Sequence, residues 1–510
     1  MSESDVISQR REKVAAWRAE GVEPYAYAFA RTHDTARVRA EHEGLAGEAV
    51  SEASVAVAGR LVTIRSHGKT VFAHLQDAEG RIQLYFRADG LPAGGFDRVK
   101  RLDAGDIVGV RGPVFRTRTG ELTVRVESFA LLTKALRPLP EKWHGLKDVE
   151  LRYRRRYLDL IANERTRRIF RTRTRIVKEI RAFLDARGFI EVETPMMHPI
   201  PGGAAARPFV THHNALGRDL YLRVAPELYL KRLLVGGFER VYEINRNFRN
   251  EGLSTMHNPE FTMLEVYSAY EDASAMMALT ESLFVHVAQA IHGSTRITYQ
   301  GQTLDLTPPW PRRSLTAMMR EAFGEDVWAA DADRLRALCR EHGLDAPATA
   351  RKAELFDALF SARVEPRLVQ PVFVTDFPLP LSPLAKAKPG DPDAADRFEP
   401  YLAGHEFANG FSELSDPLDQ LDRFEAQARQ REGGGEEAHR IDRDYVRALE
   451  YGLPPAGGLG VGVDRLVMLM TDAPSIREVI LFPQLRRPPN EDAVEEEETG
   501  APEGARDGAA

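Results

Sequence analysis

The chain has 510 residues, of which 43% are hydrophobic and 28% charged, a balance typical of a soluble globular protein with two or three domains. No apolar run approaches the roughly 20 residues of a membrane-spanning helix, and residues 1–22 lack the composition of a secretory or transit signal. A single cysteine, Cys339, excludes an internal disulfide framework and a cysteine-based zinc site, so we expect a cytoplasmic protein with no membrane partner.

The net charge of −7 lies at the end of the chain. Residues 491–510 hold eight acidic residues and one basic residue, Arg506, so residues 1–490 are neutral as a whole. The acidic segment 488–510 contains few apolar residues, and we expect it to be disordered and to act in solvation. Arginines gather at 152–175, where we expect most to form a solvated or salt-bridged helical face and a few to reach RNA phosphates.

The N-terminal part of the chain predicts a helix followed by a small barrel. Residues 6–20 have an amphipathic pattern, and a polar stretch completes a first segment, 1–54. The period then becomes that of strands, interrupted by a helical segment at 96–102. The candidate strands are 55–65, 71–77, 81–86, 106–117 and 122–133. Five strands with that interruption predict an OB β-barrel over 55–134, a fold that often displays a face to single-stranded nucleic acid.

A proline-bearing linker, 135–150, leads to a larger domain, 151–487. Its first helix has an apolar stripe over 169–184 and ends near Gly188. Strands are expected at 189–193, 221–224, 240–247, 261–267, 404–413 and 458–463, with a helix at 465–471. Short joins between neighbouring strands predict an antiparallel sheet flanked by helices, which makes the chain an α+β protein. Residues from about 312 to 371 predict a mostly helical insertion.

Three short motifs occur in order in this domain. They are Arg-Gly-Phe-Ile-Glu-Val-Glu-Thr-Pro at 187–195, Phe-Arg-Asn-Glu at 248–251 and Gly-Leu-Gly-Val-Gly-Val-Asp-Arg at 458–465. They resemble motifs 1, 2 and 3 of the class II aminoacyl-tRNA synthetases. When an amino-acid carboxylate attacks the α-phosphate of ATP, two anions must approach each other. An arginine between them relieves the repulsion, and a second arginine can hold the far end of the triphosphate.

Residues from about 55 to 487 resemble the bacterial class II lysyl-tRNA synthetases almost throughout. The matching stretches include 132–139, 157–162, 193–201, 202–206, 225–237, 240–252 and 411–414. The resemblance implies the antiparallel class II catalytic sheet, ATP with Mg²⁺, and a homodimer built partly on motif 1. It also implies a ligase that converts L-lysine and ATP to lysyl-adenylate and pyrophosphate, and then transfers lysine to the 3′ end of tRNA-Lys.

Five residues are candidates for the ATP site. Arg249 is the candidate bridge between the substrate carboxylate and the α-phosphate, and no general base is needed because that carboxylate is already ionised. The resemblance implies that Glu251 and Phe261 meet the adenine, that Arg465 stacks on its other face and reaches the γ-phosphate, and that His257 contacts phosphate. Guanidinium planes and aromatic rings both stack on a base. The structural alternative for Arg249 is an ion pair with Glu251.

Glu399 and Glu406 match the family's magnesium carboxylates. Hard oxygen ligands suit Mg²⁺, which bridges phosphates while it keeps waters. The two glutamates are seven residues apart and meet only if the chain turns within 400–404. The glycine row Gly458, Gly460 and Gly462 predicts sheet backbone packed under the nucleotide, and the alternative is a glycine bulge without function.

Acidic and aromatic side chains are expected to line an amino-acid pocket. Residues at i and i+2 on a strand share a face, which groups 265 with 267 and also 409, 411 and 413. Carboxylates that converge on one cavity repel each other unless cations enter, and an amino acid with an α-ammonium and a distal ammonium supplies two. The candidates for lysine binding are Gly203, Glu227, Arg249, Glu265, Tyr267, Asn409, Phe411 and Glu413.

The resemblance assigns roles within this pocket. It implies that Glu227 takes the α-amino group, that Glu413 with Tyr267 takes the ε-ammonium, and that Gly203 offers a backbone contact. In the barrel it implies that Arg65, Phe72 and Gln83 hold the central anticodon uridine. An aromatic ring captures a base by stacking, and a glutamine can bond to its edge. The structural alternative places Phe72 in the barrel core and Gln83 on a solvated strand.

Other functions remain open at this stage. An aspartyl- or asparaginyl-tRNA synthetase would need arginine or lysine at the pocket floor, and the glutamates argue against it. A ligase that modifies an elongation factor lacks the barrel. A non-catalytic RNA-binding paralogue is expected to lose the motif arginines or the metal carboxylates, which are present. His405 stands where an arginine is expected, and Met256 where a basic residue is common, so the phosphate contacts depart from the family pattern.

Overall fold

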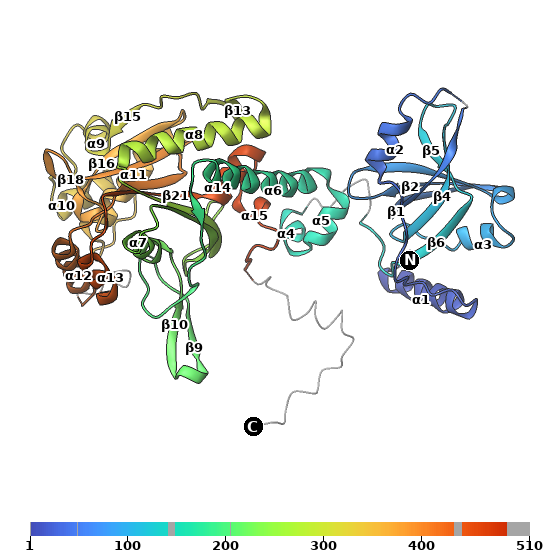
Figure 1. Ribbon diagram of the computed structural model, residues 1–510, viewed down its shortest axis with the longest axis horizontal. Helices are drawn as coiled ribbons and strands as arrows, with labels where there is room; N and C mark the ends of the chain where they lie inside the picture. Colours follow the sequence, from blue (N-terminus) through green and yellow to red (C-terminus); the bar gives the residue numbers. More distant parts are fainter. Residues whose placement is uncertain (1, 48, 141–147, 205, 433–440, 487–510) are drawn as a thin grey trace. The chain divides into compact units, whose positions relative to one another are not determined.

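The computed structural model of the chain describes residues 2–47, 49–140, 148–204, 206–432 and 441–486. It divides into two compact units, Met1–Lys147 and Asp148–Ala510 (Figure 1). The predicted acidic segment 488–510 and residues 141–147 of the predicted linker lie outside the described residues.

The first unit is a closed barrel with helices against it. Its strands are β1 (Val50–His67), β2 (Thr70–Gln76), β3 (Arg81–Arg87), β4 (Ile107–Arg116), β5 (Leu122–Arg125) and β6 (Ser128–Thr133), and its helices are α1 (Glu3–Ala19), α2 (Thr35–His42) and α3 (Gly95–Val99). The strands pair in the order β1-β2-β3-β5-β4-β6, and β1 also pairs with β4, which closes the barrel. This is the arrangement expected of an OB fold.

The segment 122–133, predicted as one strand, is two strands in the structure. β5 pairs in parallel with β3, whereas β6 pairs with β4 in antiparallel fashion. Between them, the amide of Val126 donates to the carbonyl of Tyr85 and that of Glu127 to the carbonyl of Arg111, both at 2.9 Å. Gly112 permits this close crossing, because a Cβ at Gly112 would lie 1.8 Å from the carbonyl oxygen of Arg125.

Alternation along β2 separates the barrel core from its outer face. Val71, Ala73 and Leu75 are buried in the core, and Phe72 points away from it. Trp17 of α1 is buried in the same core. Arg10 fastens α1 to the barrel, since its guanidinium donates to the carbonyls of Ala104, Ala135 and Arg137.

The second unit is built on one large, mainly antiparallel sheet. Eight strands run in the order β15-β16-β18-β20-β21-β12-β11-β7, with β17 and β19 paired to β18. Their bounds are β7 (Ile190–Glu191), β11 (Arg240–Phe248), β12 (Glu260–Ala269), β15 (Arg312–Ser314), β16 (Val372–Pro378), β17 (Ala387–Lys388), β18 (Asp391–Leu402), β19 (His405–Glu406), β20 (Ala408–Ser412) and β21 (Ala456–Gly462). Among the described strands of this sheet, the pairs β11–β7 and β15–β16 are parallel and the other pairs are antiparallel.

Helices and hairpins complete this unit. The helices are α4 (Val149–Arg154), α5 (Arg156–Ala162), α6 (Glu164–Asp185), α7 (Glu227–Val235), α8 (Ala273–His292), α9 (Leu315–Phe323), α10 (Ala332–Glu341), α11 (Lys352–Arg363), α12 (Pro417–Glu432), α13 (Arg443–Glu450), α14 (Val463–Thr471) and α15 (Ile476–Val479). Strands β9 (Val210–His213) and β10 (Arg218–Leu222) form a hairpin that projects from the body, and β8 (Met197–His198) pairs with β10. Strands β13 (Arg296–Tyr299) and β14 (Gln302–Asp305) form a separate pair.

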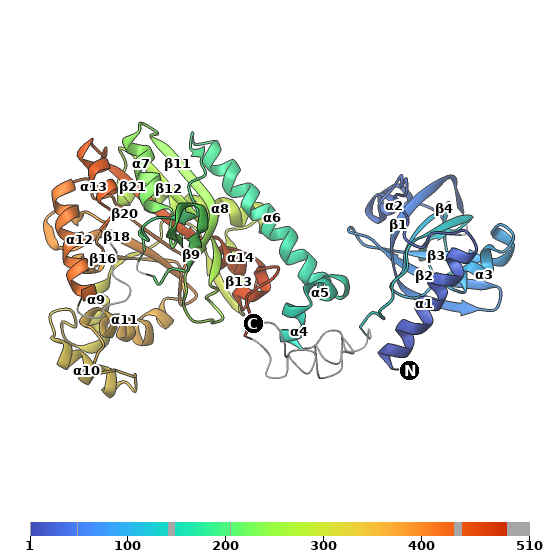
Figure 2. The same cartoon turned by 90° about the horizontal axis from the view of Figure 1, so that it is seen from below.

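The two faces of the sheet have different environments. Leu264 and Val266 of β12 point into a large apolar core with α6, α8 and α14, whereas Glu265 and Tyr267 point to the other face. Helices α7, α12 and α13 pack beside that other face, as Figure 2 shows from their side. The predicted insertion holds α9, α10 and α11, which form their own apolar cluster against β16. The sheet therefore has one structural face and one face with polar side chains.

The arginines at 152–175 are mostly paired, as the sequence predicted. Arg152 and Arg156 both bond to the buried Asp159, and Arg154 pairs with Glu150. Arg156 is fully buried and also donates to the carbonyls of residues 477, 480 and 481. These contacts fasten the last described helix of the chain to the first helices of the second unit.

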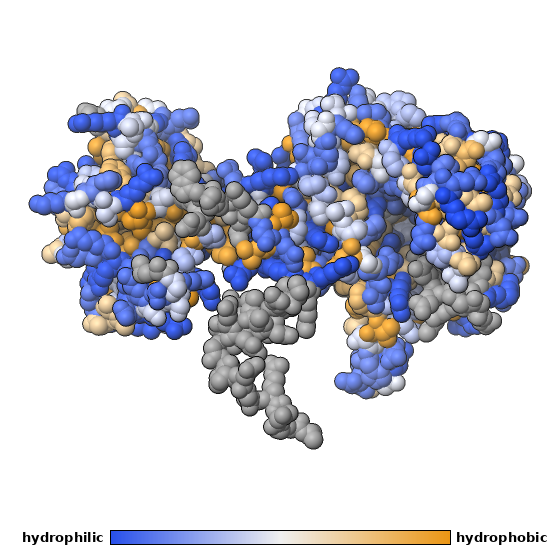
Figure 3. All heavy atoms as spheres, turned by 180° about the vertical axis from the view of Figure 1, so that it is seen from behind, coloured by the Kyte–Doolittle hydropathy of each residue, from blue (hydrophilic) through white to orange (hydrophobic). Residues whose placement is uncertain are grey.

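Helix α8 is, of the described residues, the one helix that is long and apolar enough by length and composition to cross a membrane. In the structure, Leu283, Phe284, Val287 and Ala288 of α8 are fully buried against the sheet. The core helix of a globular domain has the same composition. Polar residues cover most of both units on the face shown in Figure 3, with smaller apolar patches between them.

Substitution of Gly112 tests the crossing in the barrel. We expect Gly112→Ala to lower the free energy of unfolding of the first unit by about 1–3 kcal/mol, because the new methyl group meets backbone that cannot move aside easily. Gly44→Ala is the matched control, since a Cβ there has nothing within 4 Å. Urea unfolding of the two variants measures the difference, and equal stabilities would show that the crossing relaxes freely.

Candidate active site

The candidate site lies on three adjacent strands, β12, β21 and β20, with β21 in the centre. Residues directly opposite each other in antiparallel strands place their side chains on the same face. Two cross-strand rows matter here, Glu265–Gly460–Asn409 and Tyr267–Gly458–Phe411. Four predicted pocket residues therefore share one face, separated by a central strand that has no side chains there.

Gly458 makes room for a buried carboxylate. Glu413 follows β20 directly and is fully buried, with its amide donating to the carbonyl of Ala456 at 2.8 Å. A Cβ at Gly458 would lie 1.9 Å from Oε1 of Glu413 and 2.8 Å from the ring of Tyr267. Any residue larger than glycine at this position would displace the carboxylate. This glycine thus makes room for residues of the predicted amino-acid pocket, whereas the sequence analysis placed the glycine row under the nucleotide.

Helix α7 brings a second carboxylate and an unpredicted ammonium to the same face. Glu227 is the first residue of α7, and Lys231 follows one helical turn later. The Lys231 ammonium lies 2.5 Å from Oε1 of Glu227 and also contacts Oε2 of Glu413. Gly203, at φ +90°, faces Glu227 closely, since a Cβ there would lie 3.3 Å from the Cβ of Glu227. Both features place the backbone of residue 203 beside the start of α7.

Burial and mutual repulsion set the charges of this pocket. Burial raises the pKa of Glu265 to about 8, and the carboxylate of Glu227 adds to the rise. Burial likewise raises the pKa of Glu413, although Lys231 opposes it. Burial alone would lower the pKa of Lys231, but Glu227 and Glu413 raise it overall, so this lysine stays charged. A pocket with these shifts takes up positive charge readily, whether as protons or as ammonium groups.

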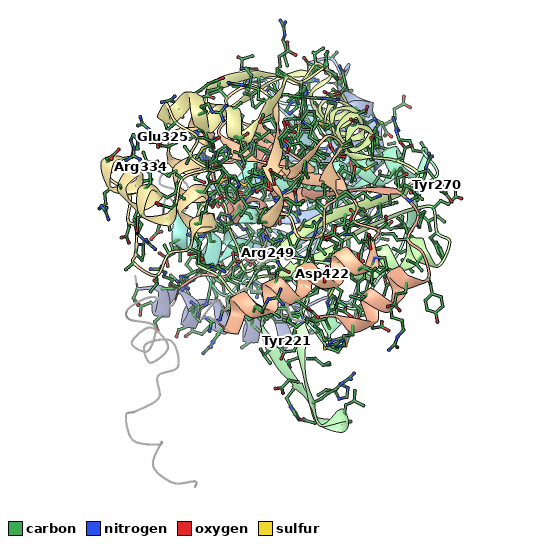
Figure 4. The ribbon with its side chains drawn as sticks, turned by 90° about the vertical axis from the view of Figure 1, so that its left-hand side faces the viewer. Tyr221, Arg249, Tyr270, Glu325, Arg334 and Asp422 are labelled. Atoms are coloured by element: carbon green, nitrogen blue, oxygen red, sulfur yellow. The ribbon has the colours of Figure 1, made fainter. Side chains whose placement is uncertain are left out.

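Arg249 lies just beyond the end of β11, toward the middle of the second unit in Figure 4, whereas Tyr270 projects at its edge. Its guanidinium stands 5.1 Å from the ring centroid of Phe261, and its buried Nε has no hydrogen-bond partner. Burial lowers the pKa of Arg249, and the nearby charge of Glu251 opposes this shift. The structure thus holds a half-buried cation with an unused donor beside an aromatic ring.

Arg465 lies at the start of α14 and joins two other predicted residues. Its Nη1 donates to the carbonyl of Glu406 at 2.5 Å and lies 3.3 Å from Oε2 of that residue. Its Nη2 is 3.1 Å from Nε2 of His257, whose Nδ1 bonds to the hydroxyl of Ser254. Of the five ATP-site candidates, Phe261 therefore contacts Arg249, and His257 contacts Arg465.

The two predicted metal ligands lie on one face of neighbouring strands. Glu406 of β19 pairs with Tyr401 of β18, and Glu399 lies two residues before Tyr401. The turn predicted within 400–404 is present, with positive φ at Ala403 and Gly404. Burial raises the pKa of Glu399 to about 7 against the opposing charge of Arg397, and the carboxylate of Glu406 adds to the rise.

This pair of carboxylates fits a divalent cation. Two neighbouring carboxylates gain from a shared positive charge, and oxygen ligands of this kind suit a hard divalent cation. In the part of the chain that the structure describes, no group of three or more His, Cys, Asp or Glu residues could hold a metal by itself. The donor set therefore suits Mg²⁺ that takes its remaining ligands from phosphate oxygens and water.

Several residues that contribute to the site were missed by the sequence analysis. Arg397 links the two halves, since it donates to Oδ1 of Asn409 at 2.9 Å and to Glu399 at 2.5 Å. Tyr445 of α13 is fully buried, and its hydroxyl has no hydrogen-bond partner. The spacing of Glu227 and Lys231, i and i+4 on a predicted helix, was a usable signal for Lys231. Arg397 lies at i and i+2 with Glu399 on one strand, which was also a usable signal, whereas Tyr445 gave none, because only the fold brings it near.

The barrel carries the second group of predicted residues on its outer face. Arg65 and Phe72 are a cross-strand pair, and Phe72 also pairs with Tyr85, whose ring centroid lies 4.8 Å away. Gln83 lies two residues before Tyr85, so it shares this face, and its amide bonds to Glu121 and Thr123. The core position considered for Phe72 is wrong, since the core side of β2 is formed by its neighbours. The aromatic pair forms a platform suited to stacking.

Comparison with known proteins identifies the family. A model of class II tRNA synthetases (D, K and N) matches residues 148–486. The chain belongs to this family. A model of OB-fold nucleic acid binding domains matches residues 55–132. The two matches confirm the predicted fold class, an N-terminal OB barrel joined to a class II catalytic domain.

Relatives of this synthetase extend over nearly the whole chain. A Lysine--tRNA ligase of Moorella thermoacetica is 55% identical over 486 residues, 95% of this chain and 98% of the relative. A Lysine--tRNA ligase of Carboxydothermus hydrogenoformans is 54% identical, with 95% and 98% covered, and one of Bacillus subtilis is 51% identical with the same coverage. The expectation of an aminoacyl-tRNA ligase is confirmed, and that of a non-catalytic RNA-binding chain is set aside.

Proposed function

We propose that this synthetase activates L-lysine with ATP and transfers it to the 3′ end of tRNA-Lys. The observation that carries the proposal is the charge of the amino-acid pocket. Three carboxylates, Glu227, Glu265 and Glu413, are buried here, and the ammonium of Lys231 contacts the first and the last of them. A fully ionised pocket has two negative charges in excess, and lysine brings two ammonium groups. The names of the relatives support the same substrate.

The same charges disfavour the related substrates. An aspartate side chain would place a further carboxylate among buried carboxylates, and an asparagine side chain would leave them without a cation. Burying an unpaired charge costs several kcal/mol, so either substrate binds much more weakly than lysine. Lys231 does not reverse this preference, because it already contacts Glu227 and Glu413.

Within the pocket each residue has a role that its position supports. Glu227 binds the α-ammonium of lysine, with the backbone at Gly203 beside it. Glu413 binds the ε-ammonium, because Oε1 is buried without a hydrogen-bond partner. The hydroxyl of Tyr267 donates to Glu265 at 2.8 Å, so its oxygen is free to accept from an ammonium. Asn409 and Phe411 line the far side, from the neighbouring strand.

Activation joins the lysine carboxylate to the α-phosphate of ATP. A carboxylate oxygen bonds to that phosphorus, the bond from phosphorus to the β-phosphate oxygen breaks, and pyrophosphate leaves. Arg249 lies between the two anions and offers an unused donor, which stabilises the charge that develops on the phosphate. Catalysis then consists of positioning and charge stabilisation, since no proton has to move.

The remaining ATP contacts follow from the arrangement around Arg249. Phe261 and Glu251 meet the adenine, and Arg465 with His257 reaches the distal phosphates once it exchanges its contact with Glu406. Glu399 and Glu406 would hold Mg²⁺, and the ion would supply positive charge that neutralises part of the charge of the phosphates. His405, adjacent to Glu406, replaces the family's arginine and leaves this end of the site with one permanent cation fewer.

The barrel recognises the anticodon. Phe72 stacks on the central uridine, with Tyr85 extending the platform, and Arg65 and Gln83 contact its phosphate and its edge.

We also propose a cytoplasmic homodimer. Exposed apolar side chains in and next to motif 1 support this interface, namely Ile190, Met196 and Met197.

Amino-acid-dependent exchange of pyrophosphate into ATP tests the substrate. Across the twenty amino acids we expect lysine to support exchange without tRNA, because all the activating groups lie in the second unit. Aspartate and asparagine should give at most background. Exchange with either of them and none with lysine would overturn the proposal.

Replacement of Arg249 tests its position between the anions. We expect Arg249→Ala to slow lysine-dependent exchange on the order of 10²-fold or more, because one preorganised charge contact is lost in a partly buried site. Arg240→Ala is a control, since that arginine begins β11, the strand that Arg249 follows, and is exposed. Near-normal exchange by a folded Arg249→Ala enzyme would show that this arginine has a structural role instead.

Phe72 separates recognition of tRNA from chemistry. We expect Phe72→Ala to weaken tRNA-Lys binding by about 1–3 kcal/mol, the value of one stacked base. Its melting temperature should change little because the ring is outside the core, whereas Leu75→Ala should destabilise the barrel by about 2–5 kcal/mol. Pyrophosphate exchange should be unaltered in both folded variants. Unchanged tRNA affinity in Phe72→Ala would refute the contact.

A further inference from the structure

One charged group in the amino-acid pocket has no part in the activity derived so far. Lys231 is fully buried, and its ammonium contacts one oxygen of each of two carboxylates, Oε1 of Glu227 and Oε2 of Glu413. It also lies 5.2 Å from the ring centroid of Phe411. Burying an ammonium is costly unless it is fully paired, so a residue in this position needs a reason beyond helix packing.

The two contacts of Lys231 leave one oxygen of each carboxylate available to another group. Its ammonium contacts one oxygen of Glu227 and one of Glu413 and leaves the second oxygen of each. On Glu413 the remaining oxygen, Oε1, points over Gly458, is buried and lacks a hydrogen-bond partner. Because Glu227 and Lys231 are one helical turn apart on α7, their pairing is fixed by the helix. The lysine side chain therefore orients Glu413 relative to Glu227.

Lys231 also affects whether Glu413 is ionised. Glu413 faces Glu227 and Lys231 from α7, Glu265 and Tyr267 from β12, and Tyr445 from α13. Two of these neighbours are carboxylates, and together with burial they favour a proton on Glu413. Lys231 is the one neighbour among these described groups that favours its ionised form. Without that ammonium, Glu413 would hold a neutral carboxyl group, which binds an ε-ammonium weakly.

We propose that Lys231 is a specificity-determining positioning residue: a permanent counter-ion that keeps Glu413 ionised and directs its free oxygen to the ε-ammonium of the substrate. This inference rests on the proposed lysine specificity. The enzyme thus uses its own lysine to prepare the site that selects lysine. The opposite reading, in which Lys231 occupies the substrate's place and must be displaced, predicts the reverse effect of its removal.

Two substitutions on α7 separate these cases. Lys231→Met keeps most of the side-chain volume and removes the charge. Arg232→Met is the control, because Arg232 is the next residue and pairs with Asp442 beside a cavity of about 100 Å³, although its guanidinium also lies 5.5 Å from the ring centroid of Tyr445. Both full-length enzymes are assayed by pyrophosphate exchange, with the Michaelis constants for lysine and for ATP determined separately.

We expect Lys231→Met to raise the Michaelis constant for lysine at least tenfold, while that for ATP changes less than twofold. Arg232→Met should leave both within about twofold. Discrimination should also fall: norleucine keeps the carbon chain of lysine without the ε-ammonium, and the preference for lysine over norleucine should drop at least tenfold in Lys231→Met. A merely structural role would move both Michaelis constants together and leave this preference unchanged.

Calorimetry of lysine binding in buffers of different ionisation enthalpy gives a second readout. A carboxyl group that is more protonated in the free enzyme must lose its proton when the ε-ammonium binds, so Lys231→Met should release more protons per lysine bound than the unaltered enzyme near pH 7. If Lys231→Met does not fold, Lys231→Gln serves in its place, since it keeps a hydrogen-bond donor but not the charge.

Each result decides the question. A tighter affinity for lysine in Lys231→Met would show that Lys231 competes with the substrate, and a lysine constant within twofold would show that it only packs the helix. Both overturn the inference. If the unaltered enzyme gives no exchange with lysine, the proposed function fails instead, and the two failures are distinguishable.

Discussion

A central strand with no side chains on the pocket face lets side chains from both neighbouring strands approach one another, and the candidate amino-acid pocket depends on this. Gly458 and Gly460 on β21 stand between Tyr267 and Glu265 on one side and Phe411 and Asn409 on the other. The Glu413 carboxylate occupies the volume that a Cβ at Gly458 would need. Like charges brought this close raise each other's proton affinity. The sheet thus gathers negative charge that the two ammonium groups of a lysine substrate could neutralise.

The opposite face of the same strands explains why this arrangement is stable. Leu264, Val266, Leu459 and Val461 are fully buried or nearly so in the core with α6, α8 and α14. Their burial anchors the register, since a slip by one residue would exchange the acidic and the apolar face. The pocket can therefore hold several unfavourable charges because the strands that carry them are fixed by apolar packing on the other side.

Arg397 joins the pocket to the phosphate side of the site. It donates to Asn409 on the amino-acid side and to Glu399 on the metal side, so the two halves share one guanidinium. On the phosphate side, Arg465 rests against Glu406 and His257, whereas Arg249 keeps an unused donor near Phe261. Paired and unpaired arginines in one site suit a reaction in which triphosphate must first bind and its charge must then be stabilised.

By itself the sequence predicted the fold class, which the family matches confirm, and a set of candidate site residues, several of which the structure brings together on one face of the sheet. Local patterns reveal these features, because strand and helix periodicity can be read from neighbouring residues. They include the glycines of β21, the Phe-Arg-Asn-Glu run and the alternation along β12. It left Phe72 between core and surface, and it took 122–133 as one strand, because a change of pairing partner has no local signal. The tertiary structure alone decided that Lys231 pairs with Glu413, that Arg397 reaches Asn409, and that the buried Tyr445 packs with α7. These contacts join residues on different elements, and only packing sets the distances between them.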